Sequence, residues 1–140
     1  LHTAWSRIGH SELGAYLPAY LFVFRKTAAR LNTMPDLEIS PADAAALLRE
    51  SKARLIDVRE SWEFTAAHIE PSLLMPMGDV PSRVHQELAP DESLLILCHH
   101  GQRSLNVALW LRNQGFEQAQ SLRGGIEAWS AEVDPAIPRY

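Results

Sequence analysis

The chain has 140 residues, of which 46% are apolar and 21% are charged, and its formal net charge is −4. This balance is typical of one globular domain and argues against a disordered chain, a collagen-like repeat and a protein with several membrane spans. Thirteen basic residues against 17 acidic ones also argue against a nucleic-acid-binding protein. The sequence contains one cysteine, Cys98. A disulfide within these 140 residues and a zinc site built from several of their cysteines are therefore excluded.

The first 34 residues differ in composition from the rest of the chain. Up to residue 33 there are four basic residues and one acidic residue, and the acidic excess lies in the remainder. The apolar run over residues 14–24 is shorter than the roughly 20 residues of a membrane-spanning helix, and its basic residues follow it, unlike those of a secretory signal. We therefore expect an N-terminal extension (1–34) and a compact domain (35–140). Two roles for the extension stay open. It is either a transit peptide or an arm that packs on its own domain or on a second copy of the chain.

Helices and strands alternate along residues 35–140. Residues 40–51 predict a helix, because Ser40 is a favoured N-cap and Pro41 is favoured at the first helical position. The continuous apolar runs 54–58 and 93–97 predict strands buried on both faces of a parallel sheet. The other predicted elements are a weaker strand at 72–75, a helix at 80–88, a helix at 103–114 that Gly115 ends as a left-handed cap, a strand at 118–122, and a short helix after Gly124 and Gly125 in which Trp129 packs on the sheet. This alternation predicts an α/β fold.

Cys98 follows the most apolar predicted strand and precedes a polar loop and a helix. In open α/β sheets, ligands bind at this end of the strands. Gly101 lets the loop curl tightly, and a loop curled before a helix N-terminus directs N–H groups inward as an anion-binding nest. A helix N-terminus and a nearby arginine favour the thiolate, which acts as a nucleophile without a histidine base. The alternative is an inert cysteine that ends a buried strand.

Three segments resemble the rhodanese (sulfurtransferase) family in its single-domain form. They are the loop Cys98-x-x-Gly101-x-Arg103-Ser104; the stretch Asp57, Val58, Arg59 and Glu60 with Glu63, Phe64, His68 and Ile69; and Gly124, Gly125 and Ile126 with Ala128 and Trp129. The segments stand in the family's order over residues 38–130. The chain departs from the family pattern beside His68, where Ala67 stands in place of the usual glycine and Glu-Pro-Ser follows at 70–72.

The resemblance implies a five-stranded parallel sheet flanked by helices on both faces, and a two-step sulfur transfer without a cofactor. Cys98 is expected to take the outer sulfur of a donor such as thiosulfate, to release sulfite, and to hold the sulfur as a persulfide. Cyanide, a small thiol or a thioredoxin-like protein would accept it, and no second cysteine in this sequence can do so. A reducing cytoplasm is the expected setting, because an exposed reactive thiol is vulnerable to oxidation. The oligomeric state stays open.

The residues around Cys98 have expected roles. Arg103 is the second catalytic candidate, which attracts the anionic donor and supports the thiolate. The substrate-binding candidates are five other loop residues, His99, His100, Gly101, Gln102 and Ser104. Asp57 and Arg59, at the end of the first buried strand, are also candidates, and we expect them to pair or to brace the loop from below. His68 is expected to form structural hydrogen bonds. No metal site is expected, because the adjacent histidines project differently and no typical ligand spacing is present.

Two other functions remain open. Phosphatases and arsenate reductases resemble this chain in using a cysteine–arginine anion loop, but they place five residues between the two, and here there are four. A shorter loop suits a sulfur atom better than a tetrahedral phosphate. The second alternative is a non-enzymatic module that carries a persulfide or binds a partner protein.

Overall fold

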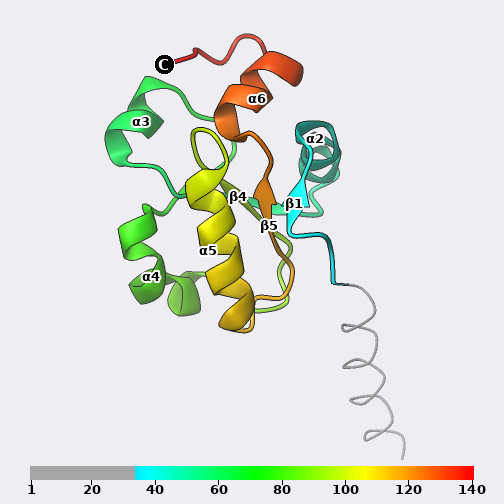
Figure 1. Ribbon diagram of the computed structural model, residues 1–140, viewed down its shortest axis with the longest axis vertical. Helices are drawn as coiled ribbons and strands as arrows, with labels where there is room; N and C mark the ends of the chain where they lie inside the picture. The colour runs from blue at the N-terminus through cyan, green and yellow to red at the C-terminus, as the bar shows by residue number, and fades with distance from the viewer. Residues whose placement is uncertain (1–33) are drawn as a thin grey trace, which may run out of the picture. The chain divides into compact units, whose positions relative to one another are not determined.

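The computed structural model describes residues 34–140, and residues 35–140 form one compact unit (Figure 1). The elements in chain order are β1 (Glu38–Ile39), α2 (Pro41–Arg49), β2 (Arg54–Asp57), α3 (Ser61–Ala66), β3 (Leu73–Leu74), the 3₁₀ turn η1 (Met77–Asp79), α4 (Val80–Glu87), β4 (Leu94–Leu97), α5 (Gln102–Asn113), β5 (Ala119–Leu122) and α6 (Gly125–Glu132). The expected roles of residues 1–33 fall outside the described residues. Within residues 34–140, no helix has the length and hydrophobicity needed to cross a membrane.

The five strands form one parallel sheet in the order β1-β5-β4-β2-β3. β4 lies at the centre, and all four of its residues are buried. β2 pairs with β4 so that Leu55 lies beside Leu95 and Ile56 beside Ile96. A strand covered on both faces needs apolar side chains at every position, which explains the continuous apolar runs. The predicted parallel sheet is confirmed.

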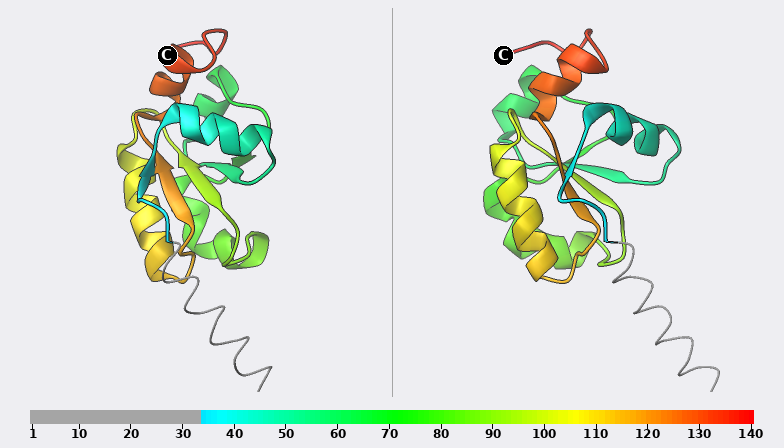
Figure 2. Two further views of the ribbon diagram at one scale, coloured as in Figure 1. Left: turned by 90° about the vertical axis from the view of Figure 1, so that its right-hand side faces the viewer. Right: turned by 45° about the vertical axis from the view of Figure 1, so that its right-hand side comes forward.

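Helices cover both faces of the sheet, with α4 and α5 on one face and α2 on the other (Figure 2). Successive side chains of a strand point to opposite faces, so the two central strands supply both cores. Ile56 and Ile96 pack in the core beneath α4 and α5, whereas Leu55 and Leu95 pack with residues of α2 and α6. Trp129 of α6 lies in this second core, as its sequence position predicts. The expected helices on both faces are confirmed.

The local signals for the longer elements are also confirmed. The Ser40 hydroxyl accepts a hydrogen bond from the Asp43 N–H at 3.2 Å and so caps α2. Gly115, which follows α5, has a φ of +97°, a conformation that glycine adopts without steric cost. The patterns above do not predict β1 or α3. β1 has two residues and α3 has six, which are too few to show a hydrophobic period.

Candidate active site

The thiol of Cys98 lies beside two polar groups of its own loop and helix. The Gly101 N–H donates a hydrogen bond to Sγ at 3.0 Å, and the thiol donates to the Ser104 Oγ at 3.3 Å. The Ser104 hydroxyl is in turn 2.7 Å from the Ser121 hydroxyl of β5. An N–H aimed at sulfur stabilises the charged form, and in that form the Ser104 hydroxyl can donate instead of accept. The site therefore offers the sulfur two potential donors.

Cys98 is buried, with 1% of its surface exposed. The expectation of an exposed thiol is therefore wrong. Cys98 directly follows β4 and continues its alternation, so it shares a face of the sheet with Ile96, and both lie in the core beneath α5. The sulfur consequently lies under the loop and not at its outer surface.

The start of α6 holds the backbone of the loop from the other side. The Ile126 N–H donates to the Cys98 carbonyl at 2.9 Å, and the Glu127 N–H donates to the His99 carbonyl at 3.2 Å. A Cβ on Gly125 would lie 2.3 Å from that His99 oxygen, and Gly125 has a φ of +63°. Both the close approach and the left-handed conformation require glycine. This contact explains why the sequence has glycine at this position, 26 residues after His99.

The two histidines of the loop are stacked. The ring centroids of His99 and His100 are 3.9 Å apart, and the Tyr140 ring lies 4.1 Å from His99 on a nearly parallel plane. Burial lowers the pKa of His99, and the neighbouring charge of His100 lowers it further, so His99 is neutral at pH 7. His100 and Gln102 are exposed. Among residues 34–140, no three His, Cys, Asp or Glu side chains are grouped as metal ligands would be.

Asp57, the last residue of β2, and Arg59 form a fully buried ion pair. Arg59 Nη2 is 2.6 Å from Asp57 Oδ2, and both side chains are 0% exposed. The same guanidinium donates to the Ala67 carbonyl at 2.7 Å and to the Glu63 carbonyl at 3.3 Å. The pair therefore ties the end of β2 to both ends of the segment around α3.

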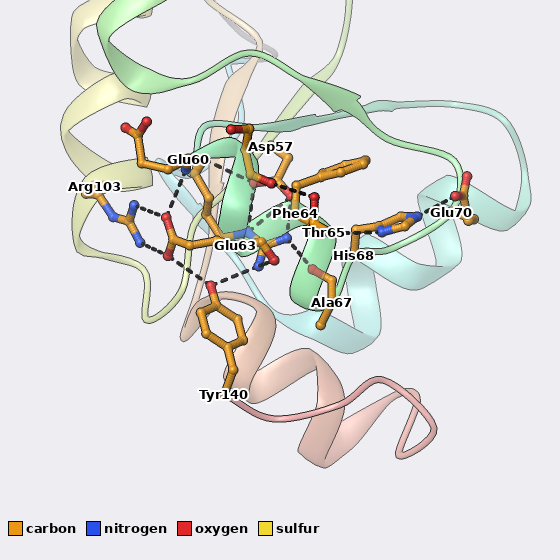
Figure 3. Close-up of polar contacts among 12 residues, drawn as sticks. Asp57, Glu60, Glu63, Phe64, Thr65, Ala67, His68, Glu70, Arg103 and Tyr140 are labelled. Carbon is orange, nitrogen blue, oxygen red and sulfur yellow. Dashed lines mark hydrogen bonds and ion pairs between the residues drawn. The ribbon is translucent and has the colours of Figure 1, made fainter.

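Arg103 forms a second ion pair, with Glu63 of α3 (Figure 3). Its two Nη atoms each donate to one carboxylate oxygen at 2.8 Å. These hydrogen bonds hold the pKa of Glu63 at about 2, and the carboxylate raises the pKa of Arg103. Glu63 is 5% exposed and Arg103 33%. The guanidinium is thus already engaged by a carboxylate, and an anionic donor would have to share it.

Three residues of this arrangement are absent from the sequence-based candidates: Glu63, Ser121 and Tyr140. Glu63 lies in the upstream family-like motif, so a sequence signal existed for it. Ser121 lies in a predicted strand, without a signal for a contact with Ser104. Tyr140 is about 80 residues from the side chains that its hydroxyl contacts, Arg59 and Glu63, and no motif includes it. His68 is confirmed as a structural hydrogen-bonding residue, since its ring nitrogens contact the Phe64 carbonyl and the Glu70 carboxylate.

Known proteins are similar to this chain in sequence and in fold. A family model described as "Rhodanese-like domain" matches residues 40–132. The putative sulfurtransferase YtwF of Bacillus subtilis is 35% identical over 103 residues, which are 71% of this chain and 98% of that protein. A crystal structure of a rhodanese-like domain protein from Staphylococcus aureus is 28% identical with a TM-score of 0.63, and the match covers 74% of this chain and 97% of that one.

A longer relative shows the domain in another setting. The chloroplastic rhodanese-like/PpiC domain-containing protein 12 of Arabidopsis thaliana is 39% identical over 92 residues, which are 64% of this chain. The chain spans 31% of that protein. The similarity therefore concerns the domain and does not extend to the rest of the plant protein.

Proposed function

The chain belongs to the rhodanese-like domain family, and from this premise we propose that it is a sulfurtransferase in which Cys98 carries the transferred sulfur as a persulfide. The observation that supports this proposal is the position of the chain's one thiol, at the carboxyl edge of the central strand with the Gly101 N–H 3.0 Å from its sulfur. Two relatives support it by their descriptions: the B. subtilis protein is a putative sulfurtransferase, and the S. aureus protein is a rhodanese-like domain protein.

In the first step, the Cys98 thiolate attacks the outer sulfur of thiosulfate. A new S–S bond forms, the S–S bond of the donor breaks, and sulfite leaves with the electron pair of that bond. The terminal sulfur of the persulfide carries the negative charge. The Gly101 N–H contacts Sγ, the sulfur bonded to the charged one, and we propose that it and the N-terminus of the 12-residue helix α5 stabilise this nearby charge. Arg103, shared with Glu63, draws the donor toward the loop.

In the second step, a nucleophile removes the outer sulfur and restores the thiolate. Cyanide serves in an assay, and a small thiol or a thioredoxin-like protein is the proposed acceptor in the cell. These 140 residues hold no second cysteine, so the accepting group comes from outside them. The exposed residues His100 and Gln102 flank the loop and are proposed to influence the choice of donor and acceptor. A reducing compartment such as the cytoplasm would keep the thiol available.

Steady-state transfer of sulfur from thiosulfate to cyanide tests the proposal. We expect thiocyanate formation by the wild-type chain and a rate on the order of a thousand-fold lower for Cys98→Ser, which removes the nucleophile. The control is Ser82→Ala, which removes an exposed hydroxyl from α4 and should keep the wild-type rate. Equal rates for the wild type and Cys98→Ser would refute the proposal.

Two alternatives have distinct outcomes in the same preparation. A cysteine phosphatase would hydrolyse p-nitrophenyl phosphate in a Cys98-dependent manner. The loop length disfavours this, because four residues separate Cys98 from Arg103 and those enzymes place five between the two. A persulfide carrier would load sulfur once at Cys98 without steady-state turnover. Single loading without turnover would therefore replace the enzyme by the carrier.

A further inference from the structure

The Tyr140 hydroxyl contacts both ion pairs (Figure 3), and its ring contacts the loop. Its ring stacks on His99 with a centroid distance of 4.1 Å and an angle of 14°. Its hydroxyl accepts a hydrogen bond from Arg59 Nη1 at 2.8 Å and donates one to Glu63 Oε1 at 2.9 Å. Trp62 meets only the edge of the ring, at 6.1 Å and 83°. Tyr140 is thus the side chain that joins the buried pair, the second pair and the loop.

The hydroxyl of Tyr140 is chemically suited to this position. Arg59 is a donor and Glu63 is an acceptor, and a hydroxyl can satisfy both at the same time. Burial raises the pKa of Tyr140, so the phenol stays protonated and keeps its donor at neutral pH. Phenylalanine would fill the same space without either hydrogen bond.

The ring of Tyr140 acts on a residue bonded directly to Cys98. His99 is held by its neighbours on two sides, since its side chain lies between the rings of His100 and Tyr140. Its carbonyl accepts the Glu127 N–H. Because the rings and the backbone fix His99 together, they also fix the peptide group that follows the nucleophile.

We propose that Tyr140 is a positioning residue for the Cys98 loop. Its ring acts on the loop through the stack on His99, and its hydroxyl acts on Arg103 through Glu63. Its effect on the reaction rate rests on the proposed sulfur transfer. Its effect on His99 does not, and the two are measured separately.

Kinetics of Tyr140→Phe and Tyr140→Ala separate the hydroxyl from the ring. Without the hydroxyl, the Glu63 carboxylate loses one hydrogen-bond donor and binds the Arg103 guanidinium more strongly. The guanidinium is then less available to an anionic donor. We therefore expect Tyr140→Phe to raise the KM for thiosulfate about three-fold and to leave kcat unchanged. Tyr140→Ala also removes the stack, so kcat should fall about ten-fold. Trp62→Ala, which removes the exposed neighbour of Tyr140, should leave both constants within about two-fold of wild type.

The titration of His99, followed by NMR and assigned with His99→Gln, provides a readout that does not depend on catalysis. Loss of the covering ring exposes the imidazole to water, so Tyr140→Ala should raise the pKa of His99 toward its ordinary value. Tyr140→Phe keeps the ring and should not change it. The titratable and charged groups that face His99 are His100, Glu127, Glu63, Arg103 and Tyr140.

The outcomes are distinguishable. An unchanged kcat, KM and His99 titration in a folded Tyr140→Ala variant would overturn the positioning role, with folding checked by thermal unfolding. If Tyr140→Ala does not fold, an unchanged KM for thiosulfate in Tyr140→Phe overturns the action on Arg103. If the wild-type chain transfers no sulfur from thiosulfate, the proposed function fails, and the His99 titration alone decides the role of Tyr140.

Discussion

Two acid–arginine pairs lie at the same edge of the sheet and differ in their access to water. Asp57 and Arg59 are two residues apart in sequence, and both are 0% exposed. Glu63 and Arg103 are 40 residues apart, on α3 and α5, and the arginine is 33% exposed. The first pair is closed to any ligand, whereas the second presents one side of its guanidinium to solvent. The comparison teaches that Arg59, fully buried with Asp57, can brace the site but cannot meet a ligand, whereas Arg103 is accessible to an anion.

The buried pair is supported on all sides. Its guanidinium donates to the Asp57 carboxylate, to the carbonyls of Glu63 and Ala67, and to the Tyr140 hydroxyl. A buried charge is tolerated only with such a full set of partners, and the loss of one member leaves the other uncompensated. In the second pair water can reach Arg103, which is 33% exposed, but hardly reaches Glu63, which is 5% exposed.

The largest expected effect on stability is that of Arg59→Met. This change leaves the Asp57 carboxylate buried without its cation, and we expect the free energy of unfolding to fall by about 3–5 kcal/mol. Urea unfolding at pH 7 measures the loss. The control is Arg54→Met, which breaks a pair with Glu92 whose partners are 44% and 34% exposed and should cost less than about 1 kcal/mol. Similar losses for the two variants would remove the distinction between buried and open pairs.

Glu63→Gln should have an intermediate effect that depends on pH. The pKa of Glu63 is about 2 in the folded protein, against an ordinary value of 4.5. A lowered carboxyl pKa stabilises the fold above pH 4.5, and this contribution is lost as the pH falls toward 2. We expect Glu63→Gln to cost roughly 3 kcal/mol at pH 7.

Urea unfolding of the wild type and Glu63→Gln from pH 7 down to the lowest pH at which both fold tests this dependence. The difference between their free energies of unfolding should stay constant down to about pH 4.5 and then decrease. Glu87→Gln, whose carboxylate pairs with Arg83 on an exposed helix face, is the control and should show a much smaller difference. A difference that does not change with pH would show that the charge of Glu63 does not stabilise the fold.

Arg103→Met should have the smallest effect on stability of the three. Glu63 is 5% exposed and loses its cation, but it keeps its hydrogen bonds from the Glu60 N–H and the Tyr140 hydroxyl, so we expect a loss of about 2 kcal/mol. The rate of sulfur loading from thiosulfate should nevertheless fall about ten-fold or more, because the donor loses its cation. Arg83→Met removes a cation on α4 that pairs with Glu87 and should not change loading. A loading rate for Arg103→Met equal to wild type would place Arg103 with the structural pair.

The sequence predicts what depends on neighbours along the chain. The apolar runs of β2 and β4, the Ser40 cap and the left-handed Gly115 are all local features, and each is confirmed. The loop motif also places Arg103 close to Cys98, since four residues separate the two, and Arg103 lies in the first turn of α5.

What the sequence does not predict depends on contacts between distant segments. Nothing in a pattern shows that Glu63 engages Arg103, or that Tyr140 reaches a carboxylate 77 residues away. The burial of Cys98 also depends on how α5 lies over the sheet. Since the charge available to a donor depends on these contacts, the electrostatics of the site can be derived only from the folded chain.

The most direct test of the central claim is a mass spectrum of the chain after incubation with thiosulfate. The account predicts a gain of about 32 Da, one sulfur atom, located at Cys98, absent from Cys98→Ser and reversed by cyanide or dithiothreitol. No gain in mass, or a gain that persists in Cys98→Ser, would contradict it.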